Sequence, residues 1–372
     1  MRRRSLPGTG LEVSEVGLTL SNLSPVWWES AEPGRVERLI QRAFDREVTF
    51  FDTADVVGGG AGEEIIGRAL RSHRWEVTLA TKGGYDFVGS TKPRFLESMR
   101  RRRGAGEIEI RSALTFAPDP DSERPQDFRP DALRLACEKS LRRLGTEVID
   151  LYQLHHPRLD ALEREEVWET LDELRREGKI RHYGVALGPG PGWAEEGGLA
   201  LERAGCRTLR LAASPLAPGG LEKLAQEAAG KGAALLVGDV HAFGLFGGPP
   251  PPPGAASSAG EEGTGEAFPP PGILRDARGR LGPRGLIRAT RSDPEAAVAW
   301  ALSFPAVASV LIRARTETEL AEATAAGQRS PLDSEETARL AEVREEVLSR
   351  VPRVLGGSTA LRPTPPGSRV RS

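Results

Sequence analysis

Short runs of β-branched, aliphatic or aromatic residues alternate along this chain with longer segments whose apolar residues recur at intervals of three and four. The first pattern is typical of buried strands and the second of amphipathic helices. Eight strands are predicted, over residues 15–20, 48–55, 76–82, 148–156, 180–187, 207–214, 233–240 and 309–314. Helices are predicted between them, over residues 35–45, 63–72, 131–144, 163–177, 193–204, 221–231, 294–303 and 317–326. This alternation predicts an α/β fold with a parallel sheet.

The third predicted helix has the clearest end signals. Its apolar face is formed by Leu133, Cys137, Leu141 and Leu144. Pro130 opens the helix, and Gly145 supplies the left-handed residue that often ends one. A last helix is predicted over 334–350, where Asp333 and Glu336 have the spacing of a capping box.

Two long interruptions break the rhythm, at about 88–129 after the third strand and about 242–293 after the seventh. The chain of 372 residues has room for a (β/α)8 barrel of about 250 residues with insertions, and loops at the carboxyl ends of strands build the active site in that fold. We expect a barrel over residues 1–355, a disordered insertion over 247–283 and a disordered tail over 356–372. A lid or substrate wall remains the alternative for the long loops.

Charge and composition narrow the class of partner. The 51 basic and 53 acidic residues nearly cancel, which argues against nucleic acid or an anionic membrane and favours a small molecule. The two cysteines form neither a disulfide framework nor a metal pattern, so no metal is expected. The same cysteine usage predicts a reducing, cytoplasmic compartment. Because no long apolar run or signal core occurs, we expect a soluble protein. Nothing in the sequence indicates the oligomeric state.

Polar residues stand at the ends of three neighbouring predicted strands. Asp52 and Asp55 end the second strand, Lys82 ends the third, and His155 and His156 end the fourth. A carboxylate, an ammonium and an imidazole at one barrel mouth would combine a charge pair with a group that titrates near neutrality. The alternative is an ion pair that closes the rim beside a hydrogen-bonded core histidine.

The sequence around these residues resembles the aldo/keto reductase family. The similar segments are GTGLEVSEVGL from residue 8, FFDTAD from 50, EEIIGRAL from 63, ATK from 80, SLRRLG from 140, IDLYQLH from 149, GKIRHYGV from 178, and residues 296–315. The resemblance implies a TIM barrel with an N-terminal hairpin, long loops after the third and seventh strands, and a C-terminal helix.

The resemblance also implies catalytic roles. In the family, a hydride moves from a nicotinamide cofactor to a carbonyl carbon while a tyrosine protonates the oxygen. The family's aspartate falls on Asp52, its lysine on Lys82 and its histidine on His155, but its tyrosine falls on Val57. Valine cannot donate a proton. Tyr85 and His155 are the two conceivable substitutes, and His155 is preferred because Tyr85 would have to fold back over the cofactor.

The cofactor side also departs from the family pattern. The family's serine–asparagine pair, sixth-strand glutamine and seventh-strand aromatic fall on Ala186, Leu187, Arg210 and Gly238. Arg313 and Arg315 stand near the start of the helix at 317–326, an arrangement suited to phosphate, and Glu322 matches an acidic residue on the adenine side. The implied cofactor is NADPH or NADH, with Arg210, Arg313, Arg315 and Glu322 as candidate contacts.

Three functions remain open at this point. The first is NAD(P)H-dependent reduction of an aldehyde or ketone, slowed or lost because of Val57. The second is a catalytically degenerate barrel that binds a nucleotide or metabolite as a sensor or partner subunit. The third is a lyase or isomerase that uses Asp52, Lys82 and His155 without hydride transfer.

Overall fold

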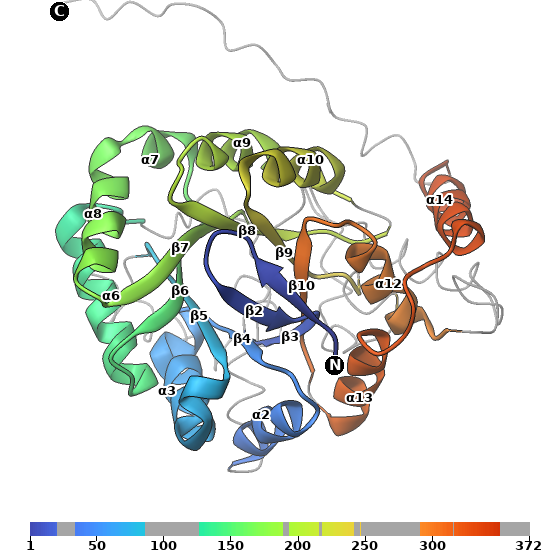
Figure 1. Ribbon diagram of the computed structural model, residues 1–372, viewed down its shortest axis with the longest axis horizontal. Coiled ribbons are helices and arrows are strands. Elements are labelled where there is room, and N and C mark those ends of the chain that lie inside the picture. The colour runs from blue at the N-terminus through green and yellow to red at the C-terminus, as the bar shows by residue number, and fades with distance from the viewer. Residues whose placement is uncertain are drawn as a thin grey trace, which may run out of the picture.

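Eight parallel strands close into a barrel in a computed structural model that describes residues 1–20, 34–85, 126–188, 193–215, 218–241, 246, 291–314 and 316–349 (Figure 1). The strands are β3 (Val16–Thr19), β4 (Phe50–Asp52), β5 (Thr78–Gly83), β6 (Ile149–His155), β7 (Ile180–Ala186), β8 (Cys206–Ala212), β9 (Ala234–Gly238) and β10 (Val307–Ile312). Strand β10 pairs with β3 and closes the ring. Each lies within a predicted strand or overlaps it closely, so the predicted TIM barrel is confirmed.

Helices surround the barrel as an outer ring (Figure 1). They are α2 (Arg35–Asp45), α3 (Ala61–Ala69), α6 (Pro130–Leu144), α7 (Leu159–Glu163), α8 (Glu165–Arg176), α9 (Ala194–Leu201), α10 (Leu221–Lys231), α12 (Asp293–Leu302), α13 (Glu317–Ala326) and α14 (Ser334–Ser349). The single helix predicted over 163–177 was wrong at its start. Arg164 has the extended backbone angles φ −75° and ψ 118°, which separate α7 from α8.

The predicted helix ends are confirmed where side chains or glycine determine them. Pro130 opens α6, and Gly145 ends it at φ 63°. At the start of α14, the Glu336 backbone N–H donates to Asp333 Oδ1 at 2.8 Å, and the Asp333 N–H donates to Glu336 Oε2 at 3.1 Å. A second capping box, formed by Ser292 and Glu295 at the start of α12, was not predicted.

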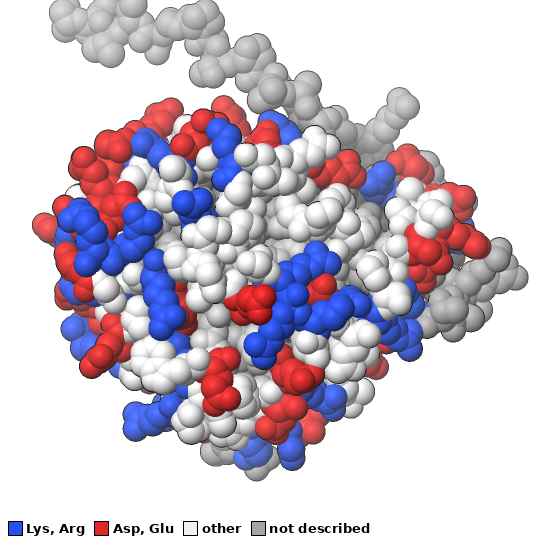
Figure 2. Space-filling view, in the orientation of Figure 1, with Lys and Arg blue, Asp and Glu red and all other residues white. Residues whose placement is uncertain are grey.

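The predicted N-terminal hairpin consists of antiparallel β1 (Arg3–Leu6) and β2 (Leu11–Ser14) and covers one end of the barrel (Figure 1). Leu6 is fully buried in the same cluster as barrel residues such as Phe50. Arg4 ties the hairpin to the barrel because its Nη1 donates to the Val307 carbonyl at 2.7 Å and its Nε lies 2.7 Å from Glu15 Oε1. Figure 2 shows this face, on which basic and acidic side chains lie close together over the hairpin.

Side chains alternate between the barrel interior and the layer beneath the helices. On β6, Leu151 belongs to the interior cluster, whereas Tyr152 and Leu154 pack in the outer core. Gln153 and His155 therefore face the interior. The same alternation turns Asp52, Lys82 and Arg210 inward, since Phe51, Leu79 and Leu209 belong to the outer core.

Helix α3 crosses α6 at Gly67, where a Cβ would lie 2.7 Å from the Leu144 carbonyl carbon. Because backbone cannot move aside cheaply, we expect Gly67→Ala to lower the free energy of unfolding by about 1–3 kcal/mol. Gly230 in α10 has no atom within 4 Å of its Cβ position. Gly230→Ala should therefore raise stability by about 0.5–1 kcal/mol. Urea denaturation measures the free energy of unfolding of both variants. If the two substitutions changed it equally, the close approach of α3 and α6 at Gly67 would be contradicted.

Several sequence predictions lie outside the described residues, namely the insertion at 247–283, the tail at 356–372 and Arg315. Among the residues that the structure describes, no helix is long and apolar enough to cross a membrane. The same residues contain no group of three or more histidine, cysteine, aspartate or glutamate side chains placed to hold a metal ion.

Candidate active site

Asp52 and Lys82 form a buried ion pair at the carboxyl ends of β4 and β5. Lys82 Nζ lies 2.6 Å from Asp52 Oδ1 and also donates to the Thr53 carbonyl at 2.5 Å. Thr19 Oγ1 at the end of β3 donates to Asp52 Oδ2 at 2.8 Å. The predicted Asp52–Lys82 pair is therefore confirmed, and its position at the ends of adjacent parallel strands explains its formation.

Burial changes the titration of the lysine. Removal from water lowers the pKa of Lys82 from 10.5 to about 8, and the Asp52 carboxylate opposes that shift. The positive charge of Arg210 adds to the lowering. The Lys82 ammonium therefore loses its proton more readily than that of an exposed lysine.

Arg210 approaches the same carboxylate from the opposite side of the barrel. It stands on β8, four strands away from β4, and its Nε lies 3.8 Å from Asp52 Oδ2. Interior residues from alternate strands share a layer in such barrels, which explains why these two meet. The guanidinium also lies beside Gly238, whose Cβ position is 3.1 Å from Arg210 Nη2.

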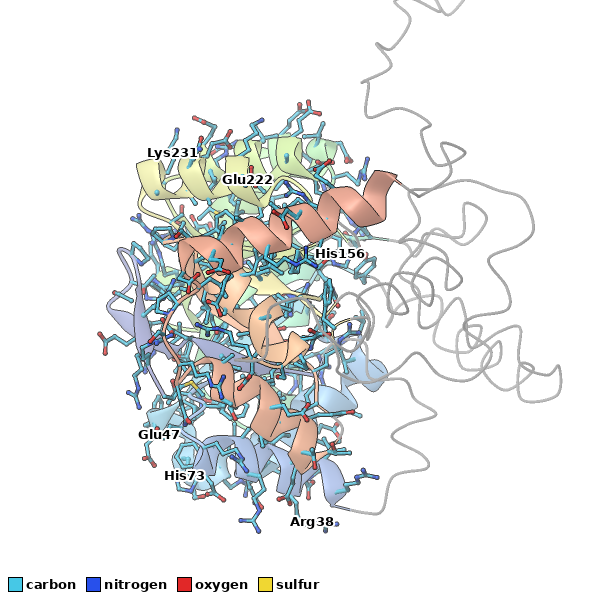
Figure 3. The ribbon with its side chains drawn as sticks, turned by 90° about the vertical axis from the view of Figure 1, so that its right-hand side faces the viewer. Arg38, Glu47, His73, His156, Glu222 and Lys231 are labelled. Carbon is cyan, nitrogen blue, oxygen red and sulfur yellow. The ribbon has the colours of Figure 1, made fainter. Side chains whose placement is uncertain are left out.

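His155, His156 and Tyr85 form an aromatic cluster at the ends of β5 and β6. The rings of Tyr85 and His155 meet edge to face with centroids 5.0 Å apart, and the His155 and His156 centroids are 4.4 Å apart. Tyr85 Oη and His156 Nδ1 are hydrogen-bonded at 3.0 Å. His156 is labelled in Figure 3 on the side of the barrel opposite the hairpin. The sequence predicted His155 here, but it did not predict the cluster.

Val57 lies just after β4, at the start of a 3₁₀ turn, η1 (Val57–Gly60). Its side chain is 6% exposed and belongs to the outer core, where Cγ1 lies 2.8 Å from the Cβ position of Gly62. At the position that would carry the family's tyrosine, the valine side chain packs into the core against the first turn of α3.

Asp55 is a buried carboxyl group close to Lys82. Burial raises the pKa of Asp55 well above its usual range, and the nearby Glu63 carboxylate raises it further. Neither Asp55 oxygen has a hydrogen-bond partner among the described residues. Glu63 itself is held by Thr81 Oγ1 at 2.7 Å and Arg143 Nε at 2.5 Å. Asp55 is therefore a second candidate proton donor at this mouth.

Gln153 is an interior residue that sequence reasoning missed. Both polar atoms of its side-chain amide are buried without a hydrogen-bond partner among the described residues. It pairs in register with Lys82 on β5 and Gly184 on β7. Strand alternation alone would have placed it in the interior two residues before His155. A buried amide with unsatisfied donors and acceptors is suited to a polar ligand.

The candidate cofactor residues lie in separate environments. Arg313 follows β10 and forms an ion pair with Asp239, with Nη2 to Oδ1 at 2.6 Å. Asp239 follows β9 with a left-handed φ of 60°. Burial, and next the charge of Arg313, lower the pKa of the neighbouring His241 to about 4. Glu322 lies exposed on α13.

Comparison with known proteins agrees with the barrel fold. The sequence model of the "Aldo/keto reductase family" matches residues 18–189. The "Uncharacterized oxidoreductase YqkF" of Bacillus subtilis is 30% identical over 186 residues, which cover 50% of this chain and 49% of that protein. The "Aldo-keto reductase YhdN" of the same organism is 31% identical over 189 residues, or 50% of this chain and 47% of that protein. The match thus spans about half the length of these curated relatives.

Solved structures support the fold over a longer span. The aldo-keto reductase AKR11C1 from Bacillus halodurans, in its holo form, has a TM-score of 0.68 at 24% identity and covers 92% of this chain and 96% of its own. The glycerol dehydrogenase AKR11B4 from Gluconobacter oxydans has a TM-score of 0.65 at 22% identity and covers 99% of both chains. At such identities the likeness concerns the fold alone. Together with the family match over residues 18–189, these findings confirm the predicted resemblance to the aldo/keto reductase family.

Proposed function

We propose that the protein reduces an aldehyde or ketone with NADPH or NADH. The observation that carries the proposal is the fully buried Asp52–Lys82 pair, which shares a barrel mouth with His155. Burying two charges is costly, and apolar residues of similar size would often stabilise the barrel as well or better. Stability alone therefore does not account for a buried ion pair at this position. A lysine with a pKa of about 8 is suited to assisting proton transfer to a carbonyl oxygen.

The residues present fit a nicotinamide dinucleotide at two points. The unpaired Gln153 amide offers a donor and an acceptor inside the barrel, and Arg313 is a cation at the phosphate side near α13. When bound, the reduced nicotinamide would supply a hydride. Arg210 would lie beside the ring and Arg313 beside a phosphate, while His155 would orient the carbonyl group of the substrate. Arg315 and Glu322 remain candidate contacts on the adenine side.

Fluorescence titration of the purified protein with NADPH, followed by an aldehyde panel, tests this proposal. Saturable binding with turnover supports it. Arg313→Ala should weaken NADPH binding roughly tenfold if the guanidinium meets a phosphate. Arg339→Ala, which removes an exposed arginine that pairs with Glu342 on α14, is the matched control and should leave binding unchanged.

A degenerate nucleotide-binding barrel is the second candidate, and Val57 is the observation that favours it. In that case NADPH binds with the same dependence on Arg313, but no carbonyl compound is reduced. If the protein does not bind NADPH at all, both candidate functions are contradicted and a lyase or isomerase is favoured.

A further inference from the structure

Tyr85 is held at the barrel mouth by contacts from two directions. It pairs with Gln126 through an isolated antiparallel bridge, and the Asp127 N–H donates to the Gly84 carbonyl at 2.8 Å. Gln126 Nε2 in turn donates to the carbonyls of His155 at 3.2 Å and His156 at 3.0 Å. The chain after β5 is thereby joined to the end of β6. The tyrosine ring is thus placed against the histidines without folding back over the barrel.

His156, which contacts Tyr85, has a left-handed backbone conformation. Its φ is 55°, a left-handed value that costs a residue other than glycine about 1 kcal/mol or more. The His156 N–H donates to the Ala186 carbonyl on β7 at 2.8 Å, which holds the turn in place. As a result, the side chains of His155 and His156 lie on the same side, with ring centroids 4.4 Å apart, and both rings meet Tyr85. Strain of this kind gathers at functional sites.

We propose that Tyr85, hydrogen-bonded to His156 and packed against His155, donates the proton that relatives take from the tyrosine absent at position 57. This assignment rests on the proposed carbonyl reduction. Tyr85 is half-buried, so its hydroxyl is not sealed in the core as that of Tyr152 is. Tyr183 is also excluded, because it faces the outer core and its hydroxyl donates to Asp172.

The proton in this reduction comes from residues of this chain, and the reductant is the reduced nicotinamide. The carbonyl carbon would accept the hydride that a bound reduced nicotinamide supplies, and the π electron pair would move to oxygen. The oxygen takes the proton from Tyr85 Oη, and the phenolate left behind takes the proton that a charged His156 holds on Nδ1. A solvent proton later restores His156. The products are an alcohol and the oxidised nicotinamide.

The direct test compares Tyr85→Phe with Tyr152→Phe, since Tyr152 has a fully buried hydroxyl without a hydrogen-bond partner among the described residues. We expect Tyr85→Phe to lower kcat for an aldehyde by about 10²-fold or more while the Kd for NADPH changes less than twofold. Tyr152→Phe should leave kcat within about twofold.

His156→Asn keeps a hydrogen-bond acceptor and tolerates the left-handed backbone, but carries no exchangeable ring proton. It should lower kcat and remove the limb of the pH profile that reports the histidine.

A spectroscopic readout is independent of turnover. The chain has three tyrosines, and burial raises the pKa of both Tyr152 and Tyr183 above the usual tyrosine range. In an alkaline titration of the protein without cofactor, the first near-ultraviolet tyrosinate signal should therefore disappear in Tyr85→Phe and persist in Tyr152→Phe. Added NADP⁺ should shift that first signal, because the cofactor would occupy the mouth that Tyr85 lines.

The outcomes separate the two proposals. A parent protein that binds NADPH and reduces aldehydes, with Tyr85→Phe equally active, overturns the assignment of Tyr85 and leaves the reductase intact. Loss of activity in Asp55→Asn, with none in Tyr85→Phe, overturns it in favour of the buried carboxyl. A parent that reduces no carbonyl compound overturns the proposed function and the assignment with it.

Discussion

Replacing Lys82 with methionine should lower the free energy of unfolding at neutral pH by about 3 kcal/mol. The change removes the ammonium 2.6 Å from Asp52 Oδ1 and keeps a side chain of similar length. Asp52 retains the Thr19 hydroxyl and the more distant Arg210, so the carboxylate is left buried with incomplete compensation. Urea denaturation measures the loss. An unchanged midpoint in Lys82→Met would show that Arg210 alone can neutralise Asp52.

The control for this substitution is Lys223→Met. Lys223 is exposed and lies 3.7 Å from Glu227 one helical turn later on α10. Exposed pairs of this kind contribute about 0–1 kcal/mol, so the control should unfold almost like the parent.

Lys82 also predicts how stability changes with pH. Its pKa is about 8 in the folded protein and 10.5 in the reference state, so the unfolded chain holds more protons between these values. The contribution of Lys82 to stability should therefore rise from pH 8 to 10.5, by at most about 1.4 kcal/mol per pH unit. The buried thiols of Cys137 and Cys206, with pKa raised to about 12, act in the opposite direction in both proteins. The parent should thus gain stability relative to Lys82→Met as the pH rises.

The Asp52–Lys82 pair could be predicted because the relevant information is local. Each residue ends a strand with a clear apolar pattern, and adjacent parallel strands bring their carboxyl ends together. Arg210 was placed by the resemblance, but its approach to Asp52 was not. That contact depends on which residues share an interior layer across the barrel, which the spacing along one strand does not reveal.

The Tyr85 cluster escaped prediction for a different reason. The position of Tyr85 depends on Gln126, some forty residues later in sequence, and on the left-handed turn at His156. Neither a bridge between loop residues nor a positive φ at histidine leaves a periodic pattern in the sequence. The break between α7 and α8 was missed similarly, because Arg164 is a good helix former whose extended backbone is set by its surroundings.

Restoring tyrosine at position 57 should rescue the loss of the proposed donor. In a Tyr85→Phe background, we expect Val57→Tyr to raise kcat for an aldehyde at least about tenfold, which is below the usual contribution of a general acid. The expectation is modest because Val57 now packs against Gly62 in the outer core, and the larger ring must leave that pocket to approach Lys82. The control is Val57→Phe in the same background, which adds the ring without the hydroxyl. If both variants fold, bind NADPH and have the same kcat, position 57 does not deliver a proton in this barrel; if only the tyrosine restores turnover, a hydroxyl at position 57 can supply the proton that Tyr85 supplies in the parent.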